Sequence, residues 1–318
     1  MFTLAKNRDE KGMELRDVMV DAIELAMADD GRVVALEADL GGASRFTNIA
    51  KKYPGRLIQC GIAEANMIGV AAGMSSEGYH PFTHTFGPFS TRRVFDQIFL
   101  SGAYAHNTLN IFGSDPGFAV GINGGTHTTW EDMALMRTIP GAIVCDPADE
   151  TQMRWIVAEY AKMEGIHYIR ANRKNVRNVY EPGSTFEFGK GNLLRQGSDV
   201  LIVACGQLVS EALDAAEALE AEGVSCSVVD MFCVKPLDEE LVLSEAAGKK
   251  LVVTFENHGV IGGLGEAICA VLSEKLPTPV RRVGVQDKFG CSGPAWDLLK
   301  LYGLDAATIC KTAHEMLG

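Results

Sequence analysis

The stretch LIQCGIAEANMIGVAAGMSSEG, residues 57–78, joins an apolar run to a series of small and aliphatic residues. Its first four residues predict a buried strand, and residues 63–76 predict a closely packed helix. One carboxylate, Glu64, stands at the start of this helix. Stabilisation by the helix dipole and by free backbone N–H groups would explain Glu64 taken alone. The apolar approach, the small residues and the lack of a basic residue nearby in sequence favour instead a carboxyl group that is buried to share a proton.

Strands and helices alternate outward from this stretch along most of the chain. The expected strands of the first part are 32–38, 57–60, 108–113, 142–145 and 167–170, with helices near 13–28, 63–76, 91–104, 131–137 and 149–163. The turn-rich segment NRKNVRNVYEPGSTFEFGKG (172–191) interrupts the alternation, which restarts at 199–205 and continues to 280–285. Apolar strands that alternate with helices predict mainly parallel sheets covered by helices. We therefore expect an α/β protein of two domains, residues 10–172 and 192–318, with a linker at 173–191.

Composition and charge limit the classes of partner. The 318 residues are 47% hydrophobic and carry a net charge of -12, whereas a nucleic-acid or anionic membrane surface needs a basic face. The eight cysteines form no C-x-x-C pair, as is typical of reduced core thiols. The N-terminal residues lack an apolar signal core, and no apolar run is long enough to span a bilayer. These features favour a cytoplasmic protein whose partners are small molecules or other proteins.

Two further segments hold residue types that suit a binding site. In THTFGPFSTRRVFDQ (83–97), Phe86 and Phe89 follow the apparent end of a strand. Either side chain could belong to the core, or the two could form a flat wall for a ring to stack on. The segment GSDPGFAVGINGGTHTTWEDM (113–133) predicts a long shaped loop that ends near His127. Capping of the next helix and a catalytic role explain His127 equally well at this point.

Taken together, the three segments resemble the transketolase family of thiamine diphosphate enzymes, in particular the C-terminal half of a transketolase. GIAE (61–64) is similar to the family's G-I-x-E, TFGPF (85–89) to T-F-x-x-F, and GINGGTH (121–127) to G-x-D-G-x-T-H. The resemblance continues to the end of the chain through VKPLDEEL (234–241), TFENHGVIGGLG (254–265), DKFGCSG (287–293) and LYGLDAATI (301–309). It implies a pyrimidine-binding domain followed by a smaller transketolase C-terminal domain.

The resemblance implies a role for each residue of these motifs. Glu64 would hydrogen-bond a ring nitrogen of the cofactor's aminopyrimidine and promote the tautomer that activates the thiazolium. Phe86 and Phe89 would stack on the pyrimidine, and His127 would hydrogen-bond substrate oxygens. Asp39, in EADLGGAS (37–44), matches the family's A-D-L and is expected on the cofactor side of the site.

The resemblance also implies an anion-binding group for the sugar phosphate. Arg16 matches by spacing one phosphate-binding arginine, and Arg170 and Arg173 lie where a second is expected. An arginine fork can grip an oxyanion with two hydrogen bonds, although ordinary salt bridges remain an alternative for all three. Ser44 or its neighbour falls near a phosphate-contacting serine.

Three positions depart from the family pattern. Asn123 replaces an aspartate that reads an acceptor hydroxyl, and Asp115 replaces a histidine near the substrate phosphate. His84 stands where glycine is usual. Because a carboxylate at position 115 would repel an anion placed there, the donor and acceptor are expected to differ from the usual pentose and heptose phosphates, and a branched or sulfonated sugar is one possibility.

The family's diphosphate and metal motif, Gly-Asp-Gly with a downstream Asn, does not occur in this sequence. We therefore expect no metal ligand on this chain and a split transketolase, in which a second chain binds the diphosphate through Mg²⁺, Ca²⁺ or Mn²⁺. A two-plus-two assembly would transfer a two-carbon ketol (glycolaldehyde) unit from a ketose phosphate to an aldose.

Three alternatives remain open from the sequence. The β subunit of a 2-oxoacid dehydrogenase decarboxylase shares both domains but usually has T-F-x-F and lacks G-x-T-H. Deoxyxylulose-phosphate synthase shares GIAE and the R-x-x-R of Arg170 and Arg173, but normally carries all domains on one chain. A degenerate subunit that only structures a partner is the non-enzyme alternative, and the presence of Glu64, both phenylalanines and His127 argues against it.

Overall fold

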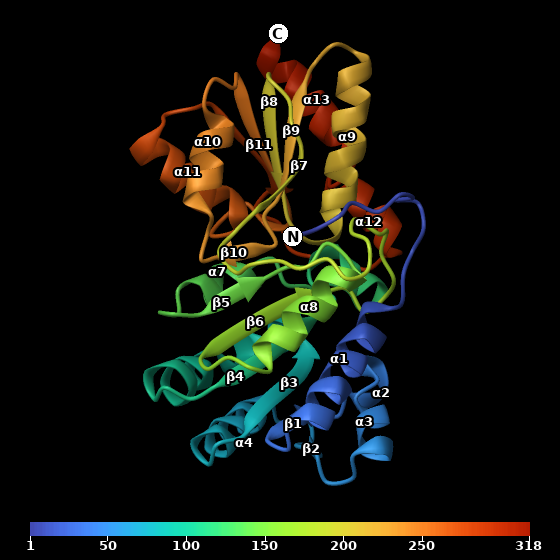
Figure 1. Ribbon diagram of the computed structural model, residues 1–318, viewed down its shortest axis with the longest axis vertical. Helices are drawn as coiled ribbons and strands as arrows, with labels where there is room; N and C mark the ends of the chain where they lie inside the picture. The colour runs from blue at the N-terminus through green and yellow to red at the C-terminus, as the bar shows by residue number, and fades with distance from the viewer.

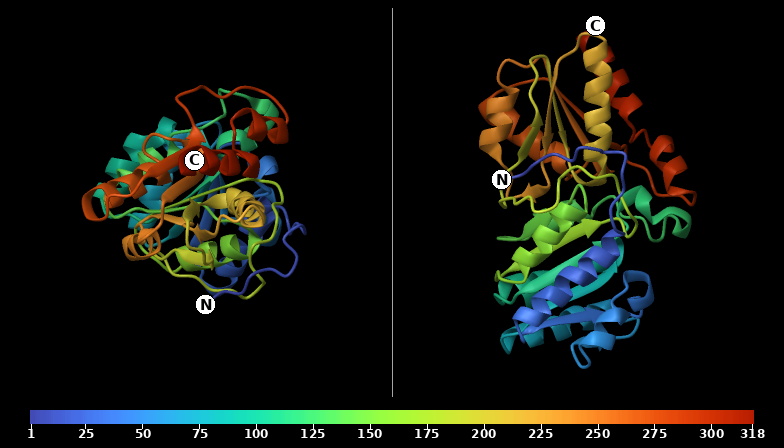
Figure 2. Two further views of the ribbon diagram at one scale, coloured as in Figure 1. Left: turned by 90° about the horizontal axis from the view of Figure 1, so that it is seen from above. Right: turned by 45° about the vertical axis from the view of Figure 1, so that its right-hand side comes forward.

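The computed structural model describes all 318 residues and shows two α/β units, each a layered sheet-and-helix structure, stacked end to end (Figure 1). The first part of the chain forms the lower unit in this view, and the C-terminus lies at the far end of the upper unit. The segment 172–191 runs across the junction between the units, as the second view also shows (Figure 2). Both parts are mainly parallel sheets with helices on their faces, so the predicted fold class is confirmed.

The first sheet has seven strands in the order β10-β5-β6-β4-β3-β1-β2, and every pair except β10 with β5 is parallel. Its first six strands in the chain are β1 (Val33–Glu37), β2 (Leu57–Gln59), β3 (His80–Phe86), β4 (Leu109–Ser114), β5 (Ile143–Cys145) and β6 (Ile166–Ala171). β1, β3, β4 and β6 are buried throughout, which explains why they lack polar alternation. Parallel order places the carboxyl ends of these strands at one edge.

Helices cover both faces of the first sheet. α1 (Leu15–Asp29) packs against α8 (Glu150–Tyr160) over one face, where their apolar residues form a core with Phe82 and Phe112. α4 (Glu64–Ser76) packs over β3 on the other face. Two short helices, α2 (Gly41–Ser44) and α3 (Thr47–Lys52), connect β1 to β2.

The helix expected over 91–104 is interrupted. α5 (Gly87–Ser90) is followed by a 3-10 turn at Arg92–Val94, by α6 (Phe95–Gln97) and by a π-helix at Ile98–Tyr104. Thr91 has non-helical backbone angles, and its hydroxyl donates to the Gly87 carbonyl at 2.7 Å. This bond competes with continuous helix formation, so α5 ends at Ser90 and the chain turns at Thr91. The predicted loop before α7 (Asp132–Arg137) contains a 3-10 segment, Gly117–Asn123, with a kink at Gly121.

The second sheet has five strands in the order β12-β11-β8-β9-β7, with β7 antiparallel to β9. Its strands are β7 (Asn192–Arg195), β8 (Val200–Ala204), β9 (Cys226–Asp230), β11 (Leu251–Gly259) and β12 (Val280–Val285). A 3-10 turn at Gly206–Leu208 leads into α9, and the helices of this domain are α9 (Val209–Ala221), α10 (Glu239–Ala246), α11 (Leu264–Lys275), α12 (Ala295–Leu301) and α13 (Ala306–Leu317).

One strand of the second domain joins the first sheet. β10 (Cys233–Lys235) pairs antiparallel with β5, and a single apolar cluster includes residues of both sheets, such as Val144 and Val203. The two domains therefore share a core. The boundaries 10–172, 173–191 and 192–318 stay a prediction.

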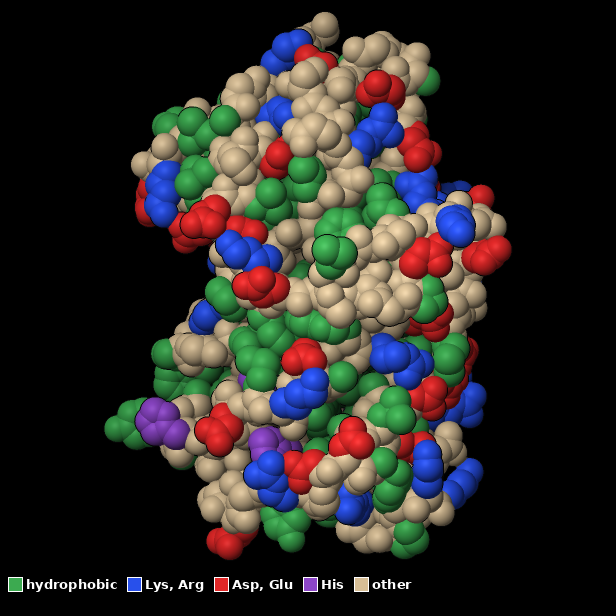
Figure 3. Space-filling model, viewed as in Figure 1, with side chains coloured by type: hydrophobic (Ala, Val, Ile, Leu, Met, Phe, Trp, Pro, Cys, Tyr) green, Lys and Arg blue, Asp and Glu red, His purple; other side chains and the backbone are tan.

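The surface mixes charges of both signs. Acidic and basic side chains are interspersed over the face shown in Figure 3, without a large basic patch. None of the helices combines the length and the apolar character needed to cross a membrane.

Candidate active site

The carboxyl edge of the first sheet gathers most of the residues singled out in the sequence. Phe86 ends β3, Asp115 follows β4, Arg173 follows β6, and Glu64 opens the helix that follows β2. This edge of a parallel sheet is where α/β proteins form their sites. The side chains divide into a carboxylate with an aromatic wall and a group of arginines.

Glu64 is buried and ion-paired. Its side chain is 6% exposed, and Oε1 accepts a hydrogen bond of 2.6 Å from Nη1 of Arg93. The Arg93 guanidinium also lies over the ring of Phe89, with Cζ 3.8 Å from the ring centroid. Glu64 therefore has a basic partner in space, although no basic residue lies near it in the sequence. No local pattern signals this pair, because Glu64 and Arg93 are 29 residues apart in the sequence.

Phe86, Phe89 and His127 form one aromatic group. The ring centroids of Phe86 and Phe89 are 6.3 Å apart with perpendicular planes. The imidazole of His127 packs edge-on against both, at 5.3 and 5.2 Å, and its Nδ1 lies 2.9 Å from the Thr126 hydroxyl. The loop therefore brings His127 to the aromatic pair, with Nε2 free of hydrogen bonds. His127 does not cap α7, because Asp132 begins that helix five residues later.

Arg173 and Arg16 lie side by side at the same edge. The backbone N–H of Arg16 donates to the Arg173 carbonyl at 3.3 Å. Arg173 donates to Asp115 through its backbone N–H at 2.8 Å and through Nε at 2.5 Å, which leaves Nη1 and Nη2 without partners. Its guanidinium lies 4.8 Å from the centroid of Phe86. Arg16 is used differently, because all its side-chain nitrogens bond Glu14 or the Ala43 carbonyl.

Asp115 supports Arg173. Its side chain is almost fully buried, and burial raises the pKa of this carboxyl while the charge of Arg173 opposes the rise. The expected repulsion of a substrate anion by Asp115 is therefore corrected, since the carboxylate faces the arginine and has almost no exposed surface. Asp115 also has φ of 52°, a left-handed conformation that places both of its oxygens within reach of Arg173.

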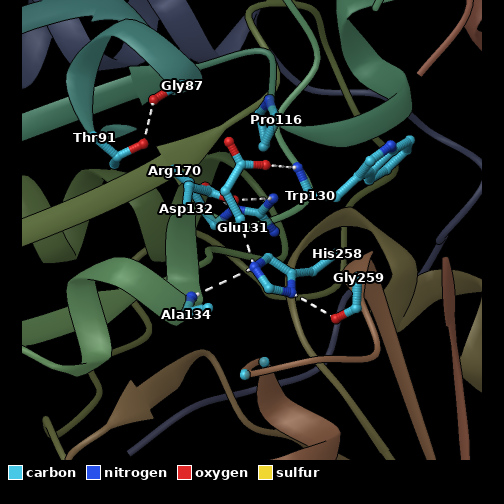
Figure 4. A network of polar contacts seen from close by, with 12 residues as sticks. Gly87, Thr91, Pro116, Trp130, Glu131, Asp132, Ala134, Arg170, His258 and Gly259 are labelled. Carbon is cyan, nitrogen blue, oxygen red and sulfur yellow. Dashed lines mark hydrogen bonds and ion pairs between the residues drawn. The ribbon is translucent and has the colours of Figure 1, made fainter. Parts of the chain in front are cut away.

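Arg170 cannot reach a substrate in this structure. Its side chain is 0% exposed and bonds Asp132 at 2.6 Å (Figure 4). It also bonds Asp146 at 2.8 Å and the Asn257 carbonyl at 3.0 Å. Burial alone lowers the pKa of Arg170, but the two carboxylates reverse this and raise it. This corrects the expectation for Arg170 and leaves Arg173, whose side chain is 19% exposed, as the accessible member of the pair.

His258, in β11 of the second sheet, lies beside the same network and contacts α7 of the first domain (Figure 4). Its Nε2 accepts from the backbone N–H of Ala134 at 3.4 Å, and Nδ1 donates to the Gly259 carbonyl at 2.7 Å. Burial lowers the pKa of His258 to about 4, so the ring is neutral at pH 7.

The remaining predicted residues fall into two groups. Ser44 is fully buried, and its hydroxyl donates to carbonyls of its own turn. This corrects the expectation that the Ser44 side chain contacts a phosphate. Asp39 and Asn123 are exposed at the edge of the site, and Asp39 has φ of 59°. His84 is buried between Phe46 and Phe112, with Nε2 at 3.0 Å from the Ser114 hydroxyl, and burial lowers its pKa to about 3.

The donor set suits one end of thiamine diphosphate. A buried carboxyl group beside an aromatic face fits an aminopyrimidine, because a ring nitrogen can share a proton with the carboxyl group while the ring stacks on the aromatic face. No group of three or more His, Cys, Asp or Glu side chains is arranged to hold a metal ion.

Comparisons with known proteins agree with this geometry. Residues 11–179 match the family described as "Transketolase, pyrimidine binding domain", and residues 189–309 match "Transketolase, C-terminal domain". The chain is 47% identical over 303 residues to the "6-deoxy-6-sulfo-D-fructose transketolase subunit SqwH" of Clostridium sp. (strain MSTE9), covering 95% of this chain and 94% of the relative.

Two other relatives are similar over almost their full length. One of the subunits of the apulose-4-phosphate transketolase of Phocaeicola vulgatus is 35% identical, with 93% of this chain and 94% of the relative covered. A solved structure described as "Split gene transketolase, inactive beta4 tetramer" superposes with a TM-score of 0.89 at 41% identity, over 96% of this chain and 99% of that one. This chain therefore belongs to the transketolase family, with the pyrimidine-binding and C-terminal domains that the family's C-terminal section carries.

Proposed function

We propose that this chain is the C-terminal subunit of a two-chain transketolase that moves a two-carbon ketol unit from a ketose with an anionic end to an aldose. The observation that carries the proposal is the grouping of Glu64, Phe86, Phe89 and His127 at one sheet edge. Thiamine diphosphate, when bound, supplies the carbanion chemistry that cleaves a bond next to a ketone.

Each residue of the group has a distinct task in the proposal. Glu64 shares a proton with a ring nitrogen of the aminopyrimidine, and its burial excludes water that would compete for this bond. Phe89, with Phe86 behind it, orients the ring. His127 has Nε2 free of hydrogen bonds and holds or moves a proton at a substrate hydroxyl oxygen.

Arg173 is the proposed contact for the substrate's anionic end. Its two free nitrogens can form the paired hydrogen bonds that a sulfonate or phosphate accepts, and Asp115 fixes its direction. Three ion pairs join the charged side chains around this site, and their charges sum to one positive charge when all are ionised. The side chains are Arg16, Arg173, Lys174, Glu14 and Asp115. One positive charge balances a sulfonate monoanion more closely than a phosphate dianion, and one relative's name specifies a sulfonated fructose. We therefore propose a sulfonated ketose as the preferred donor within the class.

The cofactor's metal and diphosphate are assigned to a partner chain that carries Gly-Asp-Gly. The names of two relatives describe transketolase subunits, and the solved relative is described as an inactive β4 tetramer. These names support a two-plus-two assembly for this chain, with sites at the interfaces between unlike subunits.

The test is reconstitution. The chain is purified alone and together with a Gly-Asp-Gly subunit from the same source, and both samples are assayed with thiamine diphosphate and Mg²⁺. We expect ketol transfer only from the pair, with a higher kcat/KM for 6-deoxy-6-sulfofructose than for fructose 6-phosphate or xylulose 5-phosphate. Tight cofactor binding and turnover by the chain alone would refute the split assembly. Condensation of pyruvate with glyceraldehyde 3-phosphate by the pair would favour deoxyxylulose-phosphate synthesis instead.

A further inference from the structure

Arg93 occupies the two contacts that the aminopyrimidine needs. Its Nη1 donates to Glu64 Oε1 at 2.6 Å, and its guanidinium lies 3.8 Å from the centre of the Phe89 ring. A guanidinium is planar and donates hydrogen bonds in its plane, so it can lie on an aromatic ring while it bonds a carboxylate at its edge. An aminopyrimidine stacked on Phe89 and bonded to Glu64 requires the same space. The two cannot bind together.

The isolated chain has an electrostatic reason for this contact. The Glu64 side chain is only 6% exposed, and a carboxylate on a buried side chain needs a compensating charge or hydrogen bonds. Arg93 provides the only side-chain hydrogen bond to Glu64. The neighbouring Arg92 faces elsewhere, because its Nη1 bonds Glu131 at 2.6 Å.

The Arg93 side chain is also free to leave. It is 45% exposed, and its guanidinium makes no hydrogen bond other than the one to Glu64. Partial exposure limits the strength of this ion pair, since water can replace the contact as the side chain turns outward. The Arg93 side chain therefore fills the site in the free chain, and its single, partly exposed ion pair allows a ligand to displace it.

We propose that Arg93 is a placeholder that closes the pyrimidine site of the free subunit and turns out when the cofactor is presented by the partner chain. This inference rests on the proposed function. It adds a regulatory step, because thiamine compounds bind poorly to the unassembled chain and the carboxylate of Glu64 stays paired until assembly.

The first experiment measures binding to the chain alone. The probe is 4-amino-5-hydroxymethyl-2-methylpyrimidine, a neutral compound without a diphosphate, and its Kd is measured by calorimetry. We expect Arg93→Ala to bind the probe about tenfold more tightly than the natural chain, while Arg92→Ala, the matched control, binds as the natural chain does. Arg93→Lys keeps the charge but loses the planar fork, so an intermediate Kd is expected.

The second experiment compares stability in two states. Arg93→Ala is expected to lower the Tm of the free chain, because Glu64 loses its partner, and to leave the Tm of the cofactor-loaded pair unchanged. Adding Glu64→Gln to Arg93→Ala is expected to restore the Tm of the free chain, because the unpaired carboxylate is then removed.

The outcomes separate the placeholder from the proposed function. The placeholder role of Arg93 would be overturned if the natural chain and Arg93→Ala had equal Kd values. It would also be overturned if Arg93→Ala lowered the Tm of the loaded pair as much as that of the free chain. In either case, ketol transfer by the natural pair would still support the proposed function. A loss of transfer on Arg93→Ala without a gain in probe affinity would likewise overturn it and make Arg93 part of the working site. Absence of ketol transfer from the natural pair would refute the function itself.

Discussion

The buried Arg170 network offers a sharp test of what holds the two domains together. Arg170 bonds both oxygens of Asp132 and one oxygen of Asp146, and it reaches across to the Asn257 carbonyl in β11. Replacing Arg170 with Met keeps an apolar stem and removes the charge. The two carboxylates, 0% and 4% exposed as residues, then lose their main counter-charge.

The expected cost follows from this geometry. Removing one partner of a buried ion pair costs about 3–5 kcal/mol, because the remaining charge stays desolvated. Asp132 keeps the hydrogen bond of 2.8 Å from the Tyr168 hydroxyl, which favours the lower half of that range. At roughly 2–4 °C per kcal/mol, the Tm should fall by about 10 °C.

The assay is thermal unfolding of the free chain followed by circular dichroism, with two controls. Arg92→Met breaks an exposed pair with Glu131 and should change the Tm by no more than about 4 °C, because exposed pairs contribute ~0–1 kcal/mol. Adding Asp132→Asn to Arg170→Met should recover part of the loss, since it removes one of the unpaired charges. A Tm for Arg170→Met within the range of Arg92→Met would refute the idea that this network stabilises the fold.

Three further predictions concern the site and the pH dependence of stability. Glu64→Gln should lower ketol transfer by the reconstituted pair at least ~100-fold while the folded pair still assembles, as measured by turnover and by gel filtration. Arg173→Lys should raise the KM for a sulfonated or phosphorylated ketose about tenfold and leave the KM for erythrulose, which has no anionic end, unchanged. Burial raises the pKa of Asp230 to about 7. Between about pH 4 and pH 7 the folded state keeps this proton while the unfolded state releases it, so the free energy of unfolding falls as the pH rises toward 7. Asp230→Asn should therefore gain Tm relative to the natural chain between pH 5 and pH 8, and a constant difference across that range would contradict the assignment.

Local patterns predicted the elements that depend on neighbouring residues. The apolar run and the small residues of 57–78 predicted β2 and α4, and strand-helix alternation predicted both parallel sheets. The strand at 233–235 could not be predicted in the same way, because its pairing with β5 is a contact between segments about ninety residues apart. Three residues carry too little periodicity to assign a strand to a sheet.

Long-range ion pairs explain the misses at the site. Arg170 lies 38 residues from Asp132 and 24 from Asp146, so its sequence surroundings could not show that its charge is already balanced. Glu64 and Arg93 are 29 residues apart. Asp115 was expected to repel an anion, and only the fold shows that it holds the arginine proposed to bind one. Charges identify candidates in a sequence, but the partner that neutralises each charge is set by the tertiary structure.

Arg93 and Arg173 show why similar contacts lead to different proposed roles. Each guanidinium lies over one phenylalanine of the aromatic pair, and each bonds a buried carboxylate. Asp115 holds Arg173 through both the backbone and Nε, so that its two terminal nitrogens point away from the bond and can grip an anion without any rearrangement. Arg93 uses a terminal nitrogen for its single bond and has no backbone tie to Glu64, so it can satisfy the carboxylate only by filling the site. An arginine held at Nε can present its fork to a substrate, whereas one held only at its tip must leave before a ligand enters.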